Sequence, residues 1–159
     1  MSADHPIDRL GPADLAAMRD LNALFARVFD EAQTYLGDPP TDAWLTGLLS
    51  DAAFFALTAR QGGRLIGGLA AYELTKFERQ RREIYLYDLG VAPEFRRQGV
   101  ATALIDHLRG IARDRGAWVI FVQADHVDDP AVALYSKLGQ REEVLHFDIA
   151  PKTGRPLTG

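Results

Sequence analysis

The sequence has 159 residues, the usual length of one compact domain, and its 47% hydrophobic and 25% charged residues exclude a disordered or fibrous chain. A net charge of −4 argues against nucleic acid as the main partner and is more compatible with a cationic one. The lack of cysteine excludes disulfides, thiolate metal sites and a cysteine nucleophile. We expect a single domain over residues 1–159, with its core at about 7–149 and a loose tail at 150–159.

Targeting and membrane signals are missing from the sequence. Residues 1–6 lack the basic and apolar regions of a signal peptide. No later apolar run approaches the ~20 residues of a membrane-spanning helix. These features predict a cytoplasmic protein with no membrane partner.

Helical patterns dominate the first third of the chain. After a short extended segment at residues 7–10, apolar residues spaced by three and four predict an amphipathic helix over 15–28. The sequence Gly-Asp-Pro-Pro at 37–40 ends it. Thr41 or Asp42 is then expected to cap a second, short helix.

Three strands are predicted in the middle of the chain. Residues 52–59 and 65–74 are two extended runs joined by a Gly-Gly turn, which is typical of a β-hairpin. Residues 84–91 form a third strand, rich in aromatic and aliphatic side chains.

Helices and strands alternate in the last third. Residues 99–114 have helical spacing, and the continuous apolar run 118–122 predicts a strand covered on both faces. A further helix at 129–138 and a last strand at 143–149 follow. The whole order predicts a mixed α/β domain with one twisted sheet.

The turn at residues 96–101 is the strongest chemical signal. It lies between a predicted strand and the start of a predicted helix, where free backbone N–H groups and the helix dipole favour an anion such as pyrophosphate. Gly99 lets the main chain approach phosphate oxygens, and Arg96 and Arg97 add positive charge. A basic loop before a helix is the simpler alternative.

In context, the sequence resembles the GNAT superfamily of N-acetyltransferases. The family's coenzyme A turn, Gln/Arg-x-x-Gly-x-Gly/Ala after a strand ending in Leu-x-Val, is matched by Arg96, Gly99 and Ala101 after residues 89–91. The later pattern Asn-x-x-Ala-x-x-x-Tyr-x-Lys-x-Gly is matched by Asp128, Ala131, Tyr135, Lys137 and Gly139. Asp128 replaces Asn, which leaves an amide contact to the pantetheine arm open. Asp128 and Asp129 also fit a structural role as the N-cap before Pro130. The resemblance implies a GNAT fold with about six strands and four helices, and acetyl-CoA as cosubstrate.

Longer strings are similar to the aminoglycoside 3-N-acetyltransferases that modify gentamicin. They lie at residues 87–91, 99–105, 122–125, 128–135 and 141–149. This similarity implies acetyl transfer to an amine of a cationic aminoglycoside and an antibiotic-resistance activity. The alternatives are an acetyltransferase for another small polyamine or amino compound, and a non-catalytic module that binds coenzyme A.

The resemblance also implies the cofactor contacts. In the family, a bulge splays the strand of residues 89–91 from its neighbour, and the N–H of Val91 faces the thioester carbonyl. Gly90 suits a distorted strand, although it could be an incidental strand glycine. Tyr135 matches the tyrosine that protonates the departing thiolate; the alternative is a core tyrosine with its hydroxyl at the surface. The implied contacts are Leu89, Gly90, Val91, Arg96, Arg97, Gln98, Gly99, Val100, Ala101, Thr102, Asp128, Ala131 and Tyr135.

An aminoglycoside carries several ammonium groups, so its site should present carboxylates, one of which, or a water, accepts the proton of the reacting amine. Asp88, beside the expected bulge, and Asp125, at the end of the next strand, are the first choices for catalysis. Either could instead be a turn cap or a solvated charge. Further acceptor contacts are expected among Glu83, Tyr87, His126, Glu142 and Glu143. A solvated surface is the simpler explanation for all of these except Glu83.

Two expectations concern metals and assembly. His5, His107 and His146 have no metal-ligand spacing with carboxylates, so no metal site is predicted. A homodimer is predicted because only 143–149 looks like a strand after the last helix, which leaves an open sheet edge. The alternative is a monomer whose edge is blunted by acidic residues.

Overall fold

The computed structural model describes residues 5–152 and 154. The chain divides into two compact units, Met1–Gln123 and Ala124–Gly159, and we describe each separately. Residues 1–4, and residues 153 and 155–159 of the predicted tail, lie outside the described residues. The prediction of a single domain stays a prediction.

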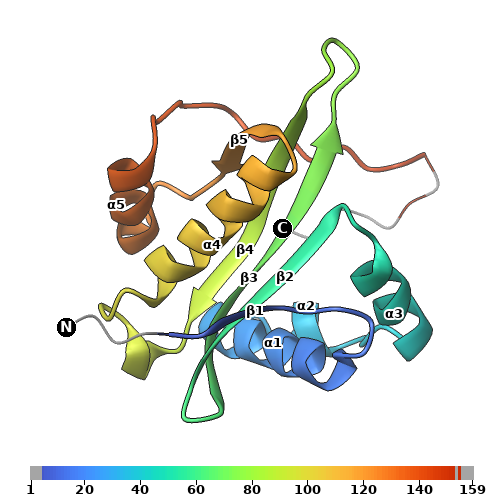
Figure 1. The fold of residues 1–159 in the computed structure, drawn as a ribbon, viewed down its shortest axis with the longest axis vertical. Helices are drawn as coiled ribbons and strands as arrows, with labels where there is room; N and C mark the ends of the chain where they lie inside the picture. The colour runs from blue at the N-terminus through green and yellow to red at the C-terminus, as the bar shows by residue number, and fades with distance from the viewer. Residues whose placement is uncertain (1–4, 153, 155–159) are drawn as a thin grey trace. The chain divides into compact units, whose positions relative to one another are not determined.

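One mixed sheet forms the centre of the first unit (Figure 1). Its order is β1-β2-β3-β4-β5. Pairing between successive strands is antiparallel from β1 to β4, and β5 pairs with β4 in parallel. The strands are β1 (Ile7–Arg9), β2 (Phe54–Gln61), β3 (Arg64–Thr75), β4 (Arg82–Val91) and β5 (Ala117–Val122). The predicted mixed α/β fold is thereby confirmed, with five strands among the described residues instead of about six.

The helices follow the predicted patterns closely. Thr41 caps α3 by accepting a 3.2 Å hydrogen bond from the Trp44 N–H, as expected from the sequence. The short α2 was not predicted, because a single turn and a half is too brief for helical periodicity to show. The elements are α1 (Leu15–Val28), α2 (Ala32–Leu36), α3 (Asp42–Ser50), the 3₁₀ helix η1 (Pro93–Phe95), α4 (Val100–Asp114) and, in the second unit, α5 (Asp129–Leu138).

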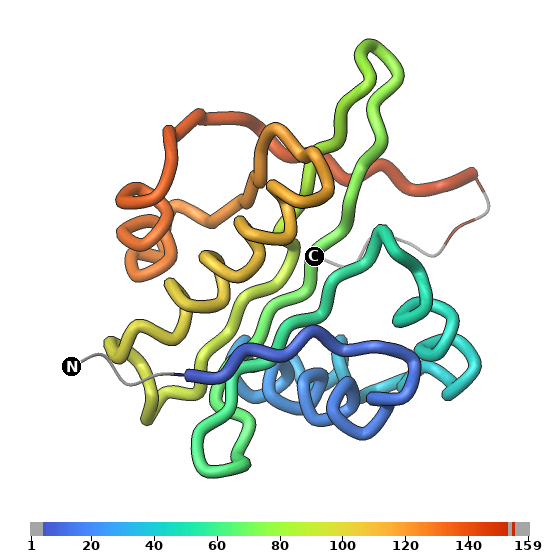
Figure 2. The backbone as a smooth tube through the Cα atoms, viewed as in Figure 1, coloured from blue at the N-terminus to red at the C-terminus, as the bar shows by residue number. Residues whose placement is uncertain are grey.

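Helices α1 and α4 pack on opposite faces of the sheet, and Figure 2 traces the chain between them. The apolar stripe of α1 buries Leu21 and Phe25 against β3 and β4, and each such side chain stabilises the fold by about 1.5–3 kcal/mol. Gly67 and Gly68 in β3 permit both helices to approach the sheet closely. A Cβ on Gly68 would lie 2.3 Å from Leu21 Cδ1, and one on Gly67 would lie 2.9 Å from Val100 Cγ1 of α4.

Strand β5 pairs with only the first half of β4. Their parallel pairing runs from Arg82↔Ala117 to Leu86↔Val122, where β5 ends. The pairing of β4 with β3 shifts register between Ala70 and Ala71, which places a bulge in β4 at Tyr87. Within the described residues, the last five residues of β4 have a strand partner on one side only.

The strand expected at residues 143–149 is not present in the structure. Residues 140–152 form no helix or strand in the structure, and Ile149 is 89% exposed. Their alternating pattern makes a strand only where a sheet edge pairs with it, and no described strand does so. Strand β5 is therefore the outer strand at this end of the sheet. The homodimer, which was inferred from the expected last strand, stays a prediction.

Strand β5 also differs from its expected burial, since Trp118 is 60% exposed. Its indole N–H donates a 3.2 Å hydrogen bond to Glu83, and the Arg81 guanidinium stacks 4.1 Å from its ring centroid. An amphipathic tryptophan with such partners is stable at the surface. Hydrophobicity alone does not distinguish it from a core residue.

Candidate active site

The predicted anion-binding turn connects η1 to α4. Arg97 and Gly99 both have left-handed backbone conformations, with φ of 61° and 80°. Gly99 is the N-cap residue of α4 and makes no side-chain cap, and the first turn contains no acidic residue. The N–H groups of the first helical turn are thus available to an anion, and the helix dipole favours negative charge there. Successive backbone N–H groups in such a turn form the concave site that phosphates prefer.

The turn is held by contacts that sequence reasoning missed. The imidazole Nε2 of the buried His5 lies 3.2 Å from the carbonyl oxygen of Gln98. The Gln98 side chain donates to the carbonyl of Glu94 at 3.3 Å. Val100 packs against β3 at Gly67. His5 and Gly67 are remote from the turn in the chain, so no local motif could have indicated their contacts.

The free edge of β4 presents a second set of backbone groups. The Ala92 N–H donates to the carbonyl of Ile66 at 2.8 Å, and strand alternation directs the preceding Val91 N–H away from β3. Gly90 is buried on the face of β4 that α1 covers, where an added Cβ would lie 3.3 Å from Phe25 Cδ1. Its role in the structure is close packing of α1 on β4.

Asp88 is a partly buried carboxylate directly after the bulge. The hydroxyl of Tyr35 on α2 donates a 2.9 Å hydrogen bond to Asp88 Oδ1. Burial raises the pKa of the Asp88 carboxyl, the Tyr35 hydrogen bond partly offsets this, and the charge of Glu31 raises the pKa further. A carboxylate of raised pKa accepts a proton more readily, as a general base must.

A row of aromatic rings crosses the sheet beside Asp88. Neighbouring ring centroids lie 4.6–5.9 Å apart along it. Tyr87, at the bulge, is 62% exposed and Tyr72 is 40% exposed, so both side chains are accessible to solvent. Aromatic rings attract ammonium groups and pack against apolar ring surfaces. The aromatic row consists of Phe54, Tyr72, Tyr87, Tyr85 and Phe121.

Glu83, an expected acceptor contact, lies apart from Asp88. The two residues are separated by about 16 Å along β4, the length of five strand residues. Glu83 accepts the hydrogen bond from the Trp118 indole described above. This is a structural contact, and the expected role of Glu83 at the acceptor stays a prediction.

The remaining predicted residues lie on the second unit. Asp128 caps α5 by accepting a 3.2 Å hydrogen bond from the Ala131 N–H, the structural role considered for it from the sequence. Burial, with a smaller effect of the Asp128 charge, raises the pKa of the Tyr135 phenol to about 12. The exposed Glu143 forms an ion pair with Arg141 at 2.6 Å. Asp125, His126 and Glu142 are exposed in the same unit.

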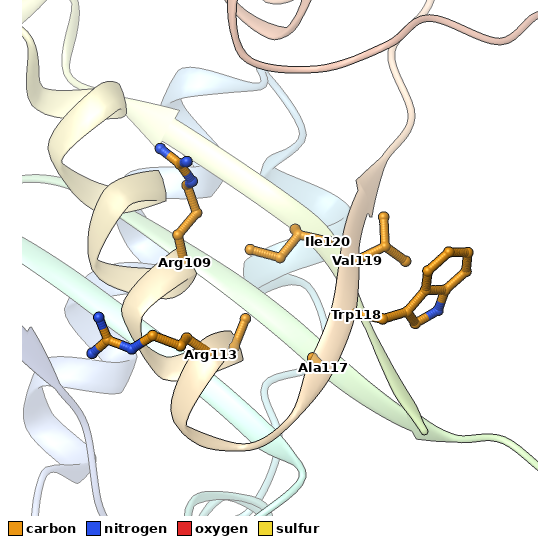
Figure 3. A pocket seen from close by; sticks show the side chains of 7 residues that line it. Arg109, Arg113, Ala117, Trp118, Val119 and Ile120 are labelled. Carbon is orange, nitrogen blue, oxygen red and sulfur yellow. The ribbon is translucent and has the colours of Figure 1, made fainter. Parts of the chain in front are cut away.

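A different hollow lies between the end of α4 and β5 (Figure 3). Arg109 and Arg113 line it from the helix, together with residues 117–120 of the strand. Both arginines pair with neighbouring aspartates at 3.0–3.1 Å. Two guanidinium groups do not suit a cationic acceptor, so this hollow is not a candidate for that site.

The described residues contain neither a metal-binding cluster nor a membrane-spanning helix. Among the described side chains, no group of three or more His, Asp or Glu residues is arranged to hold a metal ion. None of the described helices has the length and apolar character needed to cross a membrane.

The helix-terminal turn, the free edge at the end of β4 and the Asp88 carboxylate are the features of a candidate acyl-transfer site. The sequence matches the acetyltransferase (GNAT) family over residues 16–140. The chain belongs to the GNAT family. Among curated proteins, this GNAT chain is 30% identical over 87 residues to the ribosomal protein bS18-alanine N-acetyltransferase of Escherichia coli K12. That match covers 55% of this chain and 57% of the relative, so the chain spans about half of the curated relative's length.

Two solved structures are similar over almost the whole chain. An aminoglycoside acetyltransferase from an uncultured soil metagenomic sample is 51% identical, with a TM-score of 0.92 over 94% of this chain and 100% of that one. A second aminoglycoside acetyltransferase from such a sample, in complex with sisomicin, is 31% identical, with a TM-score of 0.86 over 93% and 97% of the two chains.

The first testable prediction concerns the turn. Gly99→Val should weaken acetyl-CoA binding at least tenfold, on the order of 1.4 kcal/mol, in isothermal titration calorimetry. Valine rarely adopts a φ of 80°, and its side chain would project where phosphate approaches the backbone.

Gly116→Val is the matched control. Gly116 also has a positive φ, of 71°, and an added Cβ meets no atom within 4 Å at either glycine. The control has the same backbone strain but lies beyond the other end of α4. Equal losses of affinity in both variants, or unchanged affinity in a folded Gly99→Val protein, would contradict the assignment of the turn.

Proposed function

We propose that this chain is an acetyl-CoA-dependent aminoglycoside 3-N-acetyltransferase. The observation that carries the proposal is its 51% identity, over almost the whole chain, to a solved aminoglycoside acetyltransferase. The surface around Asp88 supports it, because a carboxylate beside exposed aromatic rings suits an amino sugar with several ammonium groups.

Acetyl-CoA supplies the acetyl group as an activated thioester. In the proposed mechanism, the backbone N–H groups at the start of α4 bind its pyrophosphate, and Arg96 and Arg97 add charge. The N–H of Val91, on the free edge of β4, donates to the thioester carbonyl and stabilises the negative charge that develops on its oxygen.

Proton transfers complete the reaction. Asp88, with Asp125 as the second candidate, accepts the proton of the amine, directly or through water, as the nitrogen forms its bond to the acetyl carbon. The carbon–sulfur bond then breaks, and the Tyr135 hydroxyl assists departure of the coenzyme A thiolate by donating its proton. Because the Tyr135 phenol has a pKa of about 12, it is protonated at neutral pH and available as a donor.

The deciding experiment is thiol release from acetyl-CoA, followed with sisomicin, gentamicin and the linear polyamine spermidine as acceptors. NMR of the product locates the acetyl group. We expect turnover with the aminoglycosides and acetylation at the 3-amino group. Turnover with spermidine alone would favour a polyamine acetyltransferase, acetylation at another amine would overturn the 3-N assignment, and binding of acetyl-CoA without turnover would favour a non-catalytic module.

Tyr87 allows a test of the acceptor surface. Tyr87→Ala should raise the KM for aminoglycosides about threefold to tenfold, because an exposed cation–π contact contributes about 0.5–1 kcal/mol and ring packing adds to it. Tyr87→Phe retains the π face and is the matched control. Steady-state kinetics measure both, and an equal KM in the two variants and the wild type would place the acceptor elsewhere.

A further inference from the structure

We infer that Tyr35 is a positioning residue for Asp88: it fixes the orientation of the carboxylate at the β4 bulge and stabilises its charged form by donating a hydrogen bond. Nothing in the sequence pattern singled out this residue. The inference rests on the proposed function only in so far as Asp88 is the proton acceptor.

The Tyr35 ring packs against two phenylalanine rings. Its centroid lies 5.8 Å from the rings of both Phe25 on α1 and Phe29, the C-cap residue of that helix, and those two rings stack at 5.3 Å. Phe25 is buried and also packs against β4 at Gly90. The aromatic cluster therefore joins Tyr35 to the same strand that carries Asp88.

The backbone between α1 and α2 directs Tyr35 toward the strand. Asp30 has a left-handed conformation, with φ of 53°, which reverses the chain within a few residues. The Glu31 N–H then donates to the Ala26 carbonyl at 3.0 Å, and the Tyr35 N–H donates to the Glu31 carbonyl at 3.2 Å. A residue held in this uncommon backbone region usually serves a specific geometry, here the placement of one hydroxyl at 2.9 Å from Asp88.

Charges around Asp88 make this donor important. Burial disfavours the carboxylate form, and so does the negative charge of Glu31, whereas the Tyr35 hydrogen bond favours it. Burial and the Asp88 charge raise the pKa of the Tyr35 phenol, so the hydroxyl stays protonated and remains a donor. The titratable groups that face Asp88 are Tyr35 and Glu31 from α2 and its N-cap, Tyr72 from β3, and Tyr87 and Tyr85 from β4.

Tyr35→Phe is the direct test, because phenylalanine keeps the ring contacts with α1 and removes only the hydroxyl. The midpoint of the Asp88 carboxyl titration, followed by ¹³C NMR and assigned with Asp88→Asn, should move to higher pH. In kinetics, the acidic limb of kcat/KM should move the same way, with a loss of about threefold or more on that limb, as one net hydrogen bond predicts.

A substitution in the opposite direction strengthens the test. A fluorotyrosine placed at position 35 keeps the ring and has a more acidic, stronger donor, so it should move the Asp88 midpoint to lower pH. A merely structural role for Tyr35 would alter stability without ordered shifts of this kind.

The outcomes separate the inference from the proposed function. An unchanged or lowered Asp88 midpoint in Tyr35→Phe would overturn the inference, even if aminoglycosides are acetylated. Shifted midpoints in a protein that acetylates no aminoglycoside would support the inference and refute the proposed function, because the NMR titration requires no acceptor.

Discussion

Asp88→Asn is expected to lower kcat/KM for aminoglycosides by about 10²–10⁴-fold while acetyl-CoA binding is retained, because the variant lacks the proton acceptor. Asparagine has nearly the same shape as aspartate and can still accept the Tyr35 hydrogen bond. The large loss should therefore come from chemistry and from lost pairing with an ammonium group, not from altered packing.

The control for this variant is Asp106→Asn on the exposed surface of α4, which removes a carboxylate that pairs with Arg109. Exposed pairs contribute about 0–1 kcal/mol, so its turnover and stability should be close to wild type. Steady-state rates and acetyl-CoA calorimetry are measured for both. Asp125→Asn enters the same comparison, and wild-type rates in both the Asp88 and Asp125 variants would move the acceptor site elsewhere.

The Asp88 carboxyl also predicts a pH dependence of stability. Its pKa in the folded protein is raised above 3.8, so the folded state binds more protons than the unfolded state between these two values. The free energy of unfolding should consequently fall as the pH rises through that window. In Asp88→Asn this contribution should be absent, and denaturant titrations at several pH values measure it.

Tyr135→Phe should lower the single-turnover rate of acetyl transfer, within the range of about 10²–10⁴-fold for acid–base groups, with less effect on substrate binding. The phenol with a pKa of about 12 is protonated throughout the working range. Its removal should thus lower the pH profile as a whole without shifting a basic limb.

Rapid-quench measurements are required for Tyr135→Phe, because slow product release can hide a change in the chemical step. A retained single-turnover rate together with an unchanged acetyl-CoA dissociation constant would show that Tyr135 serves packing alone. A raised acetyl-CoA dissociation constant with an unchanged rate would assign it to cofactor binding.

Much of the fold could be read from local patterns. The spacing of apolar residues predicted α1 and α4, the Gly-Gly turn predicted the β2–β3 hairpin, and Asp128 before Pro130 predicted the cap of α5. The same patterns failed for residues 143–149 and for the burial of β5. A strand needs a partner edge, and a strand face needs a covering layer, and neither is encoded in the segment itself.

For the candidate site, the sequence was enough to locate the turn at 96–101, because its donors belong to consecutive backbone groups and follow from local conformation. It also indicated Asp88 as a carboxylate on the central strand. The tertiary structure was needed to bring Tyr35 and Glu31 to Asp88 and to place His5 against Gln98. These relations depend on distances between segments remote in the chain, which packing sets and local sequence does not.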